Sequence, residues 1–279
     1  MNIKMNSELM DMRLDLIVLV KQVPDIEKVR FDIERGRIDR SSADAEVNPF
    51  DLNALEAAIR IREEHGGKIT AVSMGPAQAE SALRDTLARG ADKAILLTDR
   101  RFAGADTLAT SYTLASAIKK IGSFDLILCG EKTVDGDTGQ VGPEVAQQLG
   151  IPHVSYVSEI KNLSKEKILV RSDMSGYYYL IESELPALIT VTKDINEPRL
   201  PSLRDRLKAR KAEVEHWTAK DLTDVADVSR FGFQGSPTTV SRISIPSEAG
   251  RIGKFFRGKT GKVVEELVEE VFEKKIVKV

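Results

Sequence analysis

The residues best suited to chemistry lie in the segment 134–143, where polar side chains alternate with glycines in the order VDGDTGQVGP. Its aspartates, threonine and glutamine can form hydrogen bonds, and its glycines leave space close to the backbone. The segment holds no histidine, cysteine or serine that could form a nucleophile–base pair. We therefore expect a binding site and predict no catalytic residue. The expected binding residues in this segment are Asp135, Gly136, Asp137, Thr138, Gly139, Gln140, Val141, Gly142 and Pro143.

The elements on either side of this segment indicate what it binds. Residues 125–130 (DLILCG) are an apolar run that ends in glycine, which is typical of a buried strand. Beyond the segment, Val145, Ala146 and Leu149 have helical spacing, and Pro143 suits a first helical position. Open α/β sheets bind ligands at such strand-to-helix loops, and the unpaired N–H groups of a helix start favour an anion. The segment is therefore a candidate phosphate or nucleotide site.

Three other interpretations of the segment deserve comparison. A calcium loop of the EF-hand type needs glycine at its sixth position and glutamate at its twelfth, which counted from Asp135 are Gln140 and Ala146. A metal-dependent phosphatase of the aspartyl-nucleophile class would use Asp135 and Asp137, but Gly139 occupies the position of its threonine. The calcium loop is thus excluded, the phosphatase remains a distant alternative, and a surface loop without a ligand is the third possibility.

A nucleotide in this chain must be shared among several loops, because the sequence contains neither a Gly-x-Gly-x-x-Gly fingerprint nor a Walker loop. Other strand ends and one helix start supply further polar or glycine residues. The additional binding positions that we expect are Leu19, Lys21, Asn48, Phe50, Asp51, Ser73, Met74, Gly75 and Gly130. With no acid–base set in view, any reaction would be carried out by a bound cofactor.

Composition excludes several classes of protein. The 41 basic and 43 acidic residues nearly cancel, so the chain has no global attraction for nucleic acid. The single cysteine, Cys129, rules out an internal disulfide or a multi-cysteine metal site and is expected in the core. His65, His153 and His216 are expected to be structural, and no metal site is predicted. No apolar run approaches the roughly 20 residues of a membrane span, and no signal peptide is visible, which favours a cytoplasmic protein without direct membrane insertion.

The whole pattern predicts an α/β fold with a doubly wound, mostly parallel sheet of the adenine-nucleotide-binding, Rossmann-like kind. Apolar strands alternate with helices every 25 to 30 residues or so, which is the signature of such sheets. A late hairpin is expected around residues 173–176 and a short one around 33–37. The expected strands are 14–20, 68–73, 93–98, 126–130, 153–160, 168–171, 177–181 and 185–192, with helices from 49, 76, 107 and 143.

The chain changes character after residue 193. Residues 196–201 include two prolines and cannot form regular structure, and residues 203–211 are strongly basic. An amphipathic helix is expected over residues 261–274, with Val264, Leu267 and Phe272 on its apolar side. A tail of this composition cannot form its own core, and its length favours a partner as the surface on which it packs.

Several motifs in a fixed order resemble the β subunit of the electron transfer flavoproteins over nearly the whole chain from Leu14. The motifs are VKQVP at 20–24, NPFD at 48–51, AVSMGP at 71–76, RGAD at 89–92, DGDTGQVGP at 135–143, LPA at 185–187 and NEPR at 196–199. The resemblance implies a heterodimer with an α subunit that carries one FAD, and AMP or a second FAD in this chain. It places Phe50 near the α-subunit flavin.

The resemblance also implies a division of the chain and a docking surface. Residues 1–13 would be a flexible extension, 14–193 the α/β nucleotide-binding domain, and 194–279 a partner-recognition loop and C-terminal arm that wraps the α subunit. The loop would dock an acyl-CoA-type dehydrogenase or a quinone oxidoreductase, whereas a merely solvated basic loop is the simpler alternative. The docking residues would be Asn196, Pro198, Arg199, Leu203, Lys208 and Lys211.

The order of residues in the 134–143 segment favours one branch of this family. It is similar to the electron-bifurcating branch and its nitrogen-fixation-associated relatives, as are FAGADTLAT at 102–110 and the long C-terminal helix. That branch implies FAD in this subunit, NADH as electron donor, and ferredoxin or flavodoxin as low-potential acceptor. The alternative is a non-bifurcating β subunit that holds AMP and relays electrons from dehydrogenases.

Overall fold

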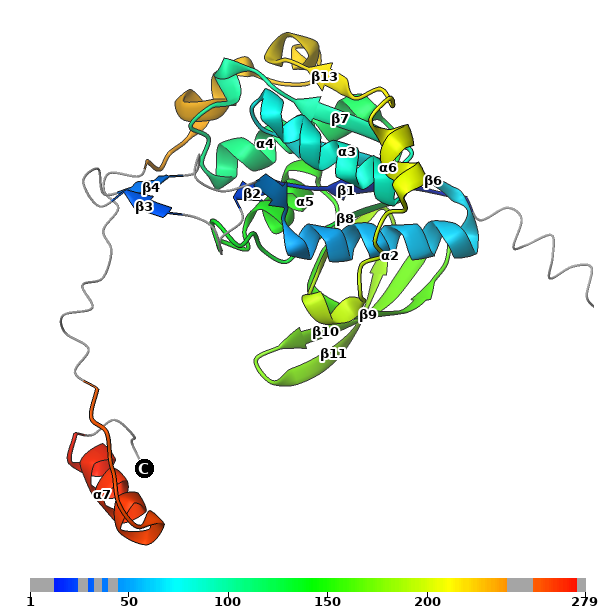
Figure 1. The fold of residues 1–279 in the computed structure, drawn as a ribbon. Helices are drawn as coiled ribbons and strands as arrows, with labels where there is room; N and C mark the ends of the chain where they lie inside the picture. Colours follow the sequence, from blue (N-terminus) through cyan, green and yellow to red (C-terminus); the bar gives the residue numbers. More distant parts are fainter. Residues whose placement is uncertain (1–12, 25–29, 33–36, 40–44, 240–252, 275–279) are drawn as a thin grey trace, which may run out of the picture.

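The computed structural model describes residues 13–24, 30–32, 37–39, 45–239 and 253–274. Except for Arg13, the expected N-terminal extension therefore lies outside the described residues. The described chain forms a large α/β body with a helix on an arm beside it (Figure 1).

A nine-stranded sheet in the order β11-β10-β9-β12-β8-β1-β6-β7-β13 forms the centre of the body. Its middle strands are parallel, and β10 pairs antiparallel with β9 and β11. The mostly parallel sheet and the late hairpin that the sequence predicts are confirmed. The strands are β1 (Leu14–Leu19), β6 (Gly67–Met74), β7 (Lys93–Leu97), β8 (Leu126–Gly130), β9 (His153–Leu163), β10 (Lys167–Met174), β11 (Tyr177–Glu184), β12 (Ala187–Val191) and β13 (Glu215–Trp217).

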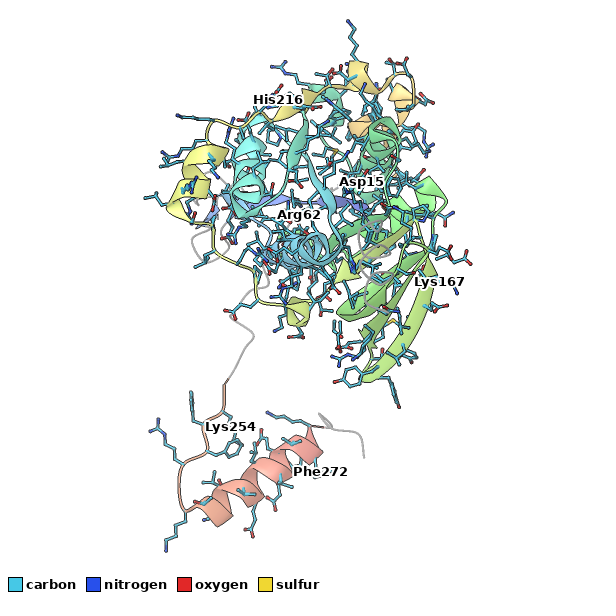
Figure 2. All side chains as sticks on the ribbon, turned by 90° about the vertical axis from the view of Figure 1, so that its right-hand side faces the viewer. Asp15, Arg62, Lys167, His216, Lys254 and Phe272 are labelled. Carbon is cyan, nitrogen blue, oxygen red and sulfur yellow. The ribbon has the colours of Figure 1, made fainter. Side chains whose placement is uncertain are left out.

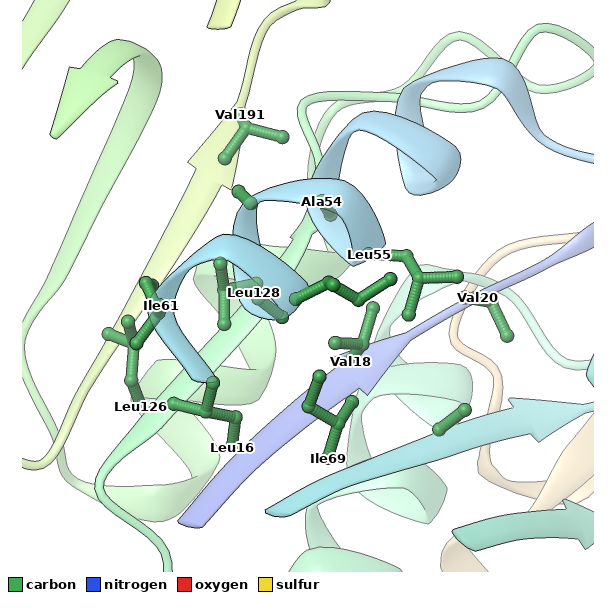
Figure 3. Close-up of a cluster of buried hydrophobic side chains, with 14 of the residues drawn as sticks. Leu16, Val18, Val20, Ala54, Leu55, Ile61, Ile69, Leu126, Leu128 and Val191 are labelled. Carbon is green, nitrogen blue, oxygen red and sulfur yellow. The ribbon is translucent and has the colours of Figure 1, made fainter. Parts of the chain in front are cut away.

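Helices cover both faces of the sheet and bury a separate apolar core on each. Because successive side chains of a strand point to opposite faces, Leu16 and Val18 of β1 enter one core and Ile17 the other. Figure 3 shows Leu16 and Val18 beneath Leu55 of α2. Burial on both faces explains why β1 is a continuous apolar run. The helices are α2 (Pro49–His65), α3 (Glu80–Arg89, after the 3-10 turn Ala77–Ala79), α4 (Thr107–Ile121) and α5 (Val141–Leu149).

The path of the chain through the sheet places a ligand crevice at its centre. From β1 the chain moves to β6 and then to β7 on one side, and α4 returns it to β8 on the other side of β1. The strand order therefore reverses between β1 and β8. Open α/β sheets bind ligands outside the carboxyl ends of the strands at such a reversal.

Short paired strands follow β1. The pair β3 (Arg30–Asp32) and β4 (Arg37–Asp39) confirms the predicted short hairpin. The second pair, β2 (Gln22–Pro24) and β5 (Ala45–Val47), is absent from the strands expected from the sequence. Backbone pairing between segments more than twenty residues apart produces these strands, and no local pattern predicts them.

The chain after β12 first packs on the body and then leaves it. Helix α6 (Leu203–Ala209), which the sequence presents only as a basic stretch, lies on α3, and β13 extends the sheet beside β7. Three 3-10 turns, Ala219–Leu222, Val228–Arg230 and Gly232–Gly235, follow. Helix α7 (Thr260–Glu273) confirms the predicted amphipathic helix, and Figure 2 shows Phe272 and Lys254 on the arm, apart from the body. None of the helices in the described ranges is long and apolar enough to cross a membrane.

Candidate functional site

A pocket of about 990 Å³ runs along the carboxyl ends of the neighbouring strands β8, β1, β6 and β7. It therefore includes the crevice at which the strand order reverses. The residues predicted from the sequence that line it are Leu19, Lys21, Asp51, Met74, Gly75, Gly130, Asp135, Gly136, Thr138, Gly139, Gln140, Val141 and Gly142.

Asp51, in the first turn of α2, joins the two strands on either side of the crevice. Its carboxylate accepts hydrogen bonds from the backbone N–H of Lys21 at 2.8 Å and from that of Gly130 at 3.0 Å. These N–H groups belong to the chain just after β1 and to the last residue of β8. Each carboxylate oxygen thus satisfies one partly buried donor, and together they fix the separation of the strand ends.

Burial controls the protonation of this corner of the pocket. Only 4% of Asp51 is exposed, and desolvation raises its pKa from 3.8 to about 7, against the opposing effect of its hydrogen bonds. Burial, with the nearby Asp51 carboxylate, also raises the pKa of the Cys129 thiol. Cys129 is therefore a protonated core residue, as predicted, and not a nucleophile.

The 134–143 segment is folded by charge pairs and by two backbone positions with positive φ. Lys21 Nζ lies 2.7 Å from Asp135 Oδ1, and Lys132 Nζ lies 2.8 Å from Asp137 Oδ1. Asp137 and Gly139 have φ values of 54° and 64°, which aspartate and glycine tolerate better than most residues. The segment leads into α5, and both Val141 and Gly142 line the pocket at the start of that helix.

Helix α5 begins earlier than predicted. Its first residue is Val141, so Pro143 lies in the third helical position and not in the first. Proline is still compatible with this position, because the N–H groups of a first helical turn have no intrahelical acceptor. The earlier start places Val141 and Gly142, which line the pocket, in the first helical turn, whose free N–H groups suit an anionic group.

Five predicted residues do not line the pocket. Asn48 is buried, and its side chain bonds to Lys132 O at 2.9 Å and Val134 N at 3.2 Å instead of capping α2. Phe50 packs under Lys132, whose Nζ lies 5.9 Å from the ring centroid. The hydroxyl of Ser73 is buried without a hydrogen-bond partner. These residues, with Asp137 and Pro143, support the surrounding backbone.

Sequence reasoning missed one whole side of the pocket, residues 98–107, which we call the pocket wall. It follows β7 and leads into α4, and Asp106 caps that helix by accepting a hydrogen bond from Ala109 N at 3.0 Å. The wall adds polar groups, including Arg100 and Thr107. The missed signal was available, because the strand predicted at residues 93–98 ends at the same sheet edge as the others. The missed lining residues on this side are Thr98, Asp99, Arg100, Phe102, Ala103, Gly104, Ala105, Asp106 and Thr107, with Thr110 beyond the wall in α4.

The predicted docking residues fall into two groups. Asn196 and Arg199 bond to α2: the Asn53 side chain donates to Asn196 O at 2.8 Å, and Arg199 Nε lies 2.8 Å from Glu56 Oε2. Pro198 lies half-buried between them. In contrast Leu203, Lys208 and Lys211 are exposed on or just after α6.

Apolar side chains accompany the charges of α6. Leu200 and Leu203 are 82% and 75% exposed. Arg84 of α3 donates to Ala209 O at 2.8 Å and to Ala212 O at 3.1 Å, which holds the end of α6 on the body. The result is a firmly placed surface of leucines and basic residues.

The geometry gives no support to phosphatase chemistry at Asp135 and Asp137. Their carboxylates form ion pairs with two different lysines, Lys21 and Lys132. Within the described part of the chain, no three His, Cys, Asp or Glu side chains are grouped as a metal site would require. The pocket instead combines apolar residues, helix starts and backbone N–H groups, which suits a nucleotide-like ligand.

Comparisons with known proteins agree with this geometry. The profile of the electron transfer flavoprotein domain matches residues 36–222. The chain is 45% identical over 265 residues to the electron transfer flavoprotein subunit beta of Thermoanaerobacterium thermosaccharolyticum, covering 95% of this chain and 100% of that protein.

Two further relatives have more specific names. Protein FixA of Azorhizobium caulinodans is 41% identical over 267 residues, which covers 94% of this chain and 95% of that protein. The caffeyl-CoA reductase-Etf complex subunit CarD of Acetobacterium woodii is 41% identical over 265 residues, covering 94% and 99% respectively.

Proposed function

The chain belongs to the electron transfer flavoprotein family as a β subunit, and from this we propose that its pocket binds FAD for electron bifurcation. In this proposal electrons enter from NADH. One passes to the flavin of the α subunit and the other to a low-potential acceptor such as ferredoxin or flavodoxin. The membership confirms the resemblance drawn from the sequence motifs. Similarity to proteins named FixA and CarD supports the choice of the bifurcating branch.

The observation that carries the proposal is one continuous pocket of about 990 Å³ along the ends of four neighbouring strands. This volume lies at the upper end of the roughly 300–1,000 Å³ that ligand sites occupy. A mononucleotide would fill only part of it, whereas a dinucleotide could extend from the start of α5 to the pocket wall. The residues present therefore fit FAD.

Each part of the pocket would have its own task in holding the cofactor. The N–H groups of Val141 and Gly142 would receive phosphate oxygens, with Thr138 and Gln140 beside them. Leu19 and Met74 offer apolar surface to a ring, and Asp51 keeps the strand ends apart. FAD would supply the hydride and single-electron chemistry that no side chain of the pocket provides.

The α subunit is the partner that family membership implies, and we propose that the C-terminal arm wraps it. Helix α7 exposes a row of apolar side chains, of which Val264 and Phe272 are 51% and 53% exposed. Rows of this kind are normally covered by another surface.

The exposed leucines and basic residues of α6 would dock the dehydrogenase or quinone oxidoreductase. We place this activity in the cytoplasm.

Counting nucleotides tests the proposal directly. The chain is co-expressed with its α subunit, the heterodimer is purified, and the nucleotides released by acid are separated and quantified. Two FAD per heterodimer are expected. One FAD with one AMP would replace bifurcation by the non-bifurcating alternative, in which AMP only fills the pocket.

A pocket variant localises the second nucleotide. Replacing Gly142, whose Cβ would lie 2.7 Å from Thr190 Cγ2 and 2.9 Å from Cys129 Sγ, should remove the nucleotide of this chain but not that of the α subunit. The replacement Gly142→Val is suitable, and Gly261→Val is the matched control, because its Cβ would meet nothing within 4 Å and its backbone is not left-handed. Retention of two FAD by the Gly142 variant would place the second FAD elsewhere.

A further inference from the structure

Residues 217–239, which we call the strap, run from the sheet edge back across α4 to the pocket wall. The strap follows α6 and begins at the last residue of β13, and the chain beyond it leads to α7. It therefore lies between the two elements that face partners. In Figure 1 this part of the chain passes over the upper part of the body, near β13 and α4.

Hydrogen bonds attach the strap to the pocket wall at both ends and in the middle. Thr98 N donates to Trp217 O at 2.9 Å, and Ala219 N donates to Asp99 Oδ2 at 3.1 Å. Further along, Phe233 N donates to Ala103 O at 3.0 Å. Each wall residue in these contacts also lines the pocket.

Asp106 is the most heavily bonded of these contacts. Its backbone N–H donates to Ser236 Oγ at 2.8 Å, and its Oδ2 accepts from both the N–H and the hydroxyl of Thr238, at 3.1 and 2.8 Å. The other oxygen caps α4 at Ala109 N. A shift of the strap would therefore move the residue that fixes the start of α4, where Thr107 and Thr110 line the pocket.

Tight packing makes the contact rigid. Phe231 of the strap is 1% exposed and lies edge-on against Phe102 of the wall, with ring centroids 5.2 Å apart. Next to it, Gly232 has a φ of 54°, and a Cβ there would lie 2.1 Å from Arg101 O. Close-packed contacts transmit a displacement instead of absorbing it.

We propose that the strap couples docking of the α subunit to nucleotide binding in the pocket. This rests on the proposed function, because it takes the arm as the α-subunit contact and a nucleotide as the ligand. In this coupling, an α subunit that holds the arm would restrain the strap that precedes it in the chain, and the strap would in turn order the pocket wall. Coupling of this kind is reciprocal, so a bound nucleotide would also tighten the heterodimer.

The test removes the hydroxyl contacts at Asp106 with the double variant Ser236→Ala/Thr238→Val. FAD and, separately, AMP are titrated into the chain alone and into the heterodimer. For the unmodified chain, the α subunit should tighten nucleotide binding about tenfold, within the range of about 5- to 150-fold that allosteric coupling spans. In the double variant, the ratio of nucleotide affinities with and without the α subunit should fall below about twofold. Placing Thr238→Ser in the double variant instead of Thr238→Val should restore most of this ratio.

A control within the strap separates this role from general destabilisation. The variant Thr223→Val/Ser229→Ala removes two hydroxyls that donate within the strap, to Lys220 O at 2.9 Å and Asp227 Oδ1 at 2.7 Å. It should keep the full ratio. The proposal is overturned if the Asp106-contact variant also keeps it, or if the unmodified chain binds nucleotide equally well with and without the α subunit.

Hydrogen exchange distinguishes failure of the strap from failure of the proposed function. Adding the α subunit should slow exchange of the amides of residues 98–107 in the unmodified chain but not in the Asp106-contact variant. If neither FAD nor AMP binds, the proposed function fails. The difference in exchange would still support an effect of the α subunit on the pocket wall through the strap. Equal protection in both chains would overturn the proposed role of the strap, whether or not a nucleotide binds.

Discussion

Asp51 shows how one buried side chain can shape the ligand site without acting on a ligand. Its two oxygens accept hydrogen bonds from backbone N–H groups at the ends of β1 and β8. These strands are neighbours in the sheet but more than a hundred residues apart in the chain. An asparagine has only one acceptor oxygen, so Asp51→Asn would direct an NH₂ group at one of these donors. We expect this variant to be destabilised, since a buried donor would lose its partner.

The destabilisation of Asp51→Asn should depend on pH. The pKa of Asp51 is raised from 3.8 to about 7, so protonation favours the folded state. Its contribution to stability is fully present below about pH 4 and is lost as the pH rises through about 7, by at most about 4 kcal/mol. The difference in unfolding free energy between the unmodified chain and the variant should therefore shrink over this range, as urea denaturation would measure.

Asp99 provides the control for this titration. Hydrogen bonds from Arg101 lower the pKa of Asp99 to about 2, so its contribution is lost only as the pH falls through about 2. Asp99→Asn should change stability by the same amount at every pH between about 4.5 and 7.5. If Asp51→Asn gave an equally constant difference, the raised pKa of Asp51 would be wrong.

Gly130 tests how closely the backbone approaches at the crevice. A Cβ on Gly130 would lie 2.5 Å from Phe50 Cβ and 2.7 Å from Asp51 Oδ1. Gly130→Ala should therefore cost about 1–3 kcal/mol, as overpacking does, and should weaken nucleotide binding. Gly136→Ala is the comparison, because the nearest atom to its Cβ would be Thr133 Oγ1 at 3.4 Å. Thermal melts of both variants measure the contrast, and equal melting temperatures would refute it.

At the scale of elements, Arg199 holds the segment that leads to α6 against α2. Its guanidinium contacts Glu56 at 2.8 Å and Glu63 at 2.6 Å, and its carbonyl accepts from Arg89 of α3 at 2.6 Å. These contacts point inward, so its main effect on docking would be through the position of α6. The two glutamates raise the pKa of Arg199 further, and the charge persists at any working pH.

Arg199→Met should loosen this segment without unfolding the body. Because the arginine is 37% exposed, we expect a loss of only about 1–2 kcal/mol in unfolding free energy, with faster amide exchange in residues 196–209. Lys208→Met is the matched control, since Lys208 forms only a longer contact with Asp205 at 3.7 Å. Unchanged exchange in Arg199→Met would show that other contacts position α6.

The elements differ in how far the sequence predicts them. The start of helix α4 at Thr107 is predicted to the residue, because Asp106 provides a local capping signal. The strand β13 is missed, because Glu215–Trp217 becomes a strand only through pairing with β7. The same limit applies to the site. The 134–143 segment could be predicted because its residues form a local pattern. The contacts of the pocket wall with the strap, in contrast, join residues about 130 positions apart.

At the scale of the molecule, the proposed nucleotide pocket and the proposed partner surface occupy different regions. The pocket opens at the carboxyl ends of the strands, whereas α7 lies on the arm, away from the sheet (Figure 1). The formal net charge is only −2, so attraction between whole molecules contributes little to assembly. In the proposed heterodimer, recognition of the α subunit would then depend on local apolar contacts, which the row along α7 would supply.

Truncating this row should separate assembly from folding. Leu267 and Phe272 are 45% and 53% exposed, so Leu267→Ser/Phe272→Ser should leave the melting temperature of the chain alone unchanged. If the α subunit covers both side chains, their loss should weaken the heterodimer at least about tenfold, as sedimentation or calorimetry would measure. Glu266→Ser/Glu269→Ser, on exposed positions of the same helix, should keep the affinity. Equal affinities for the two double variants would mean that the apolar row of α7 faces something other than the α subunit.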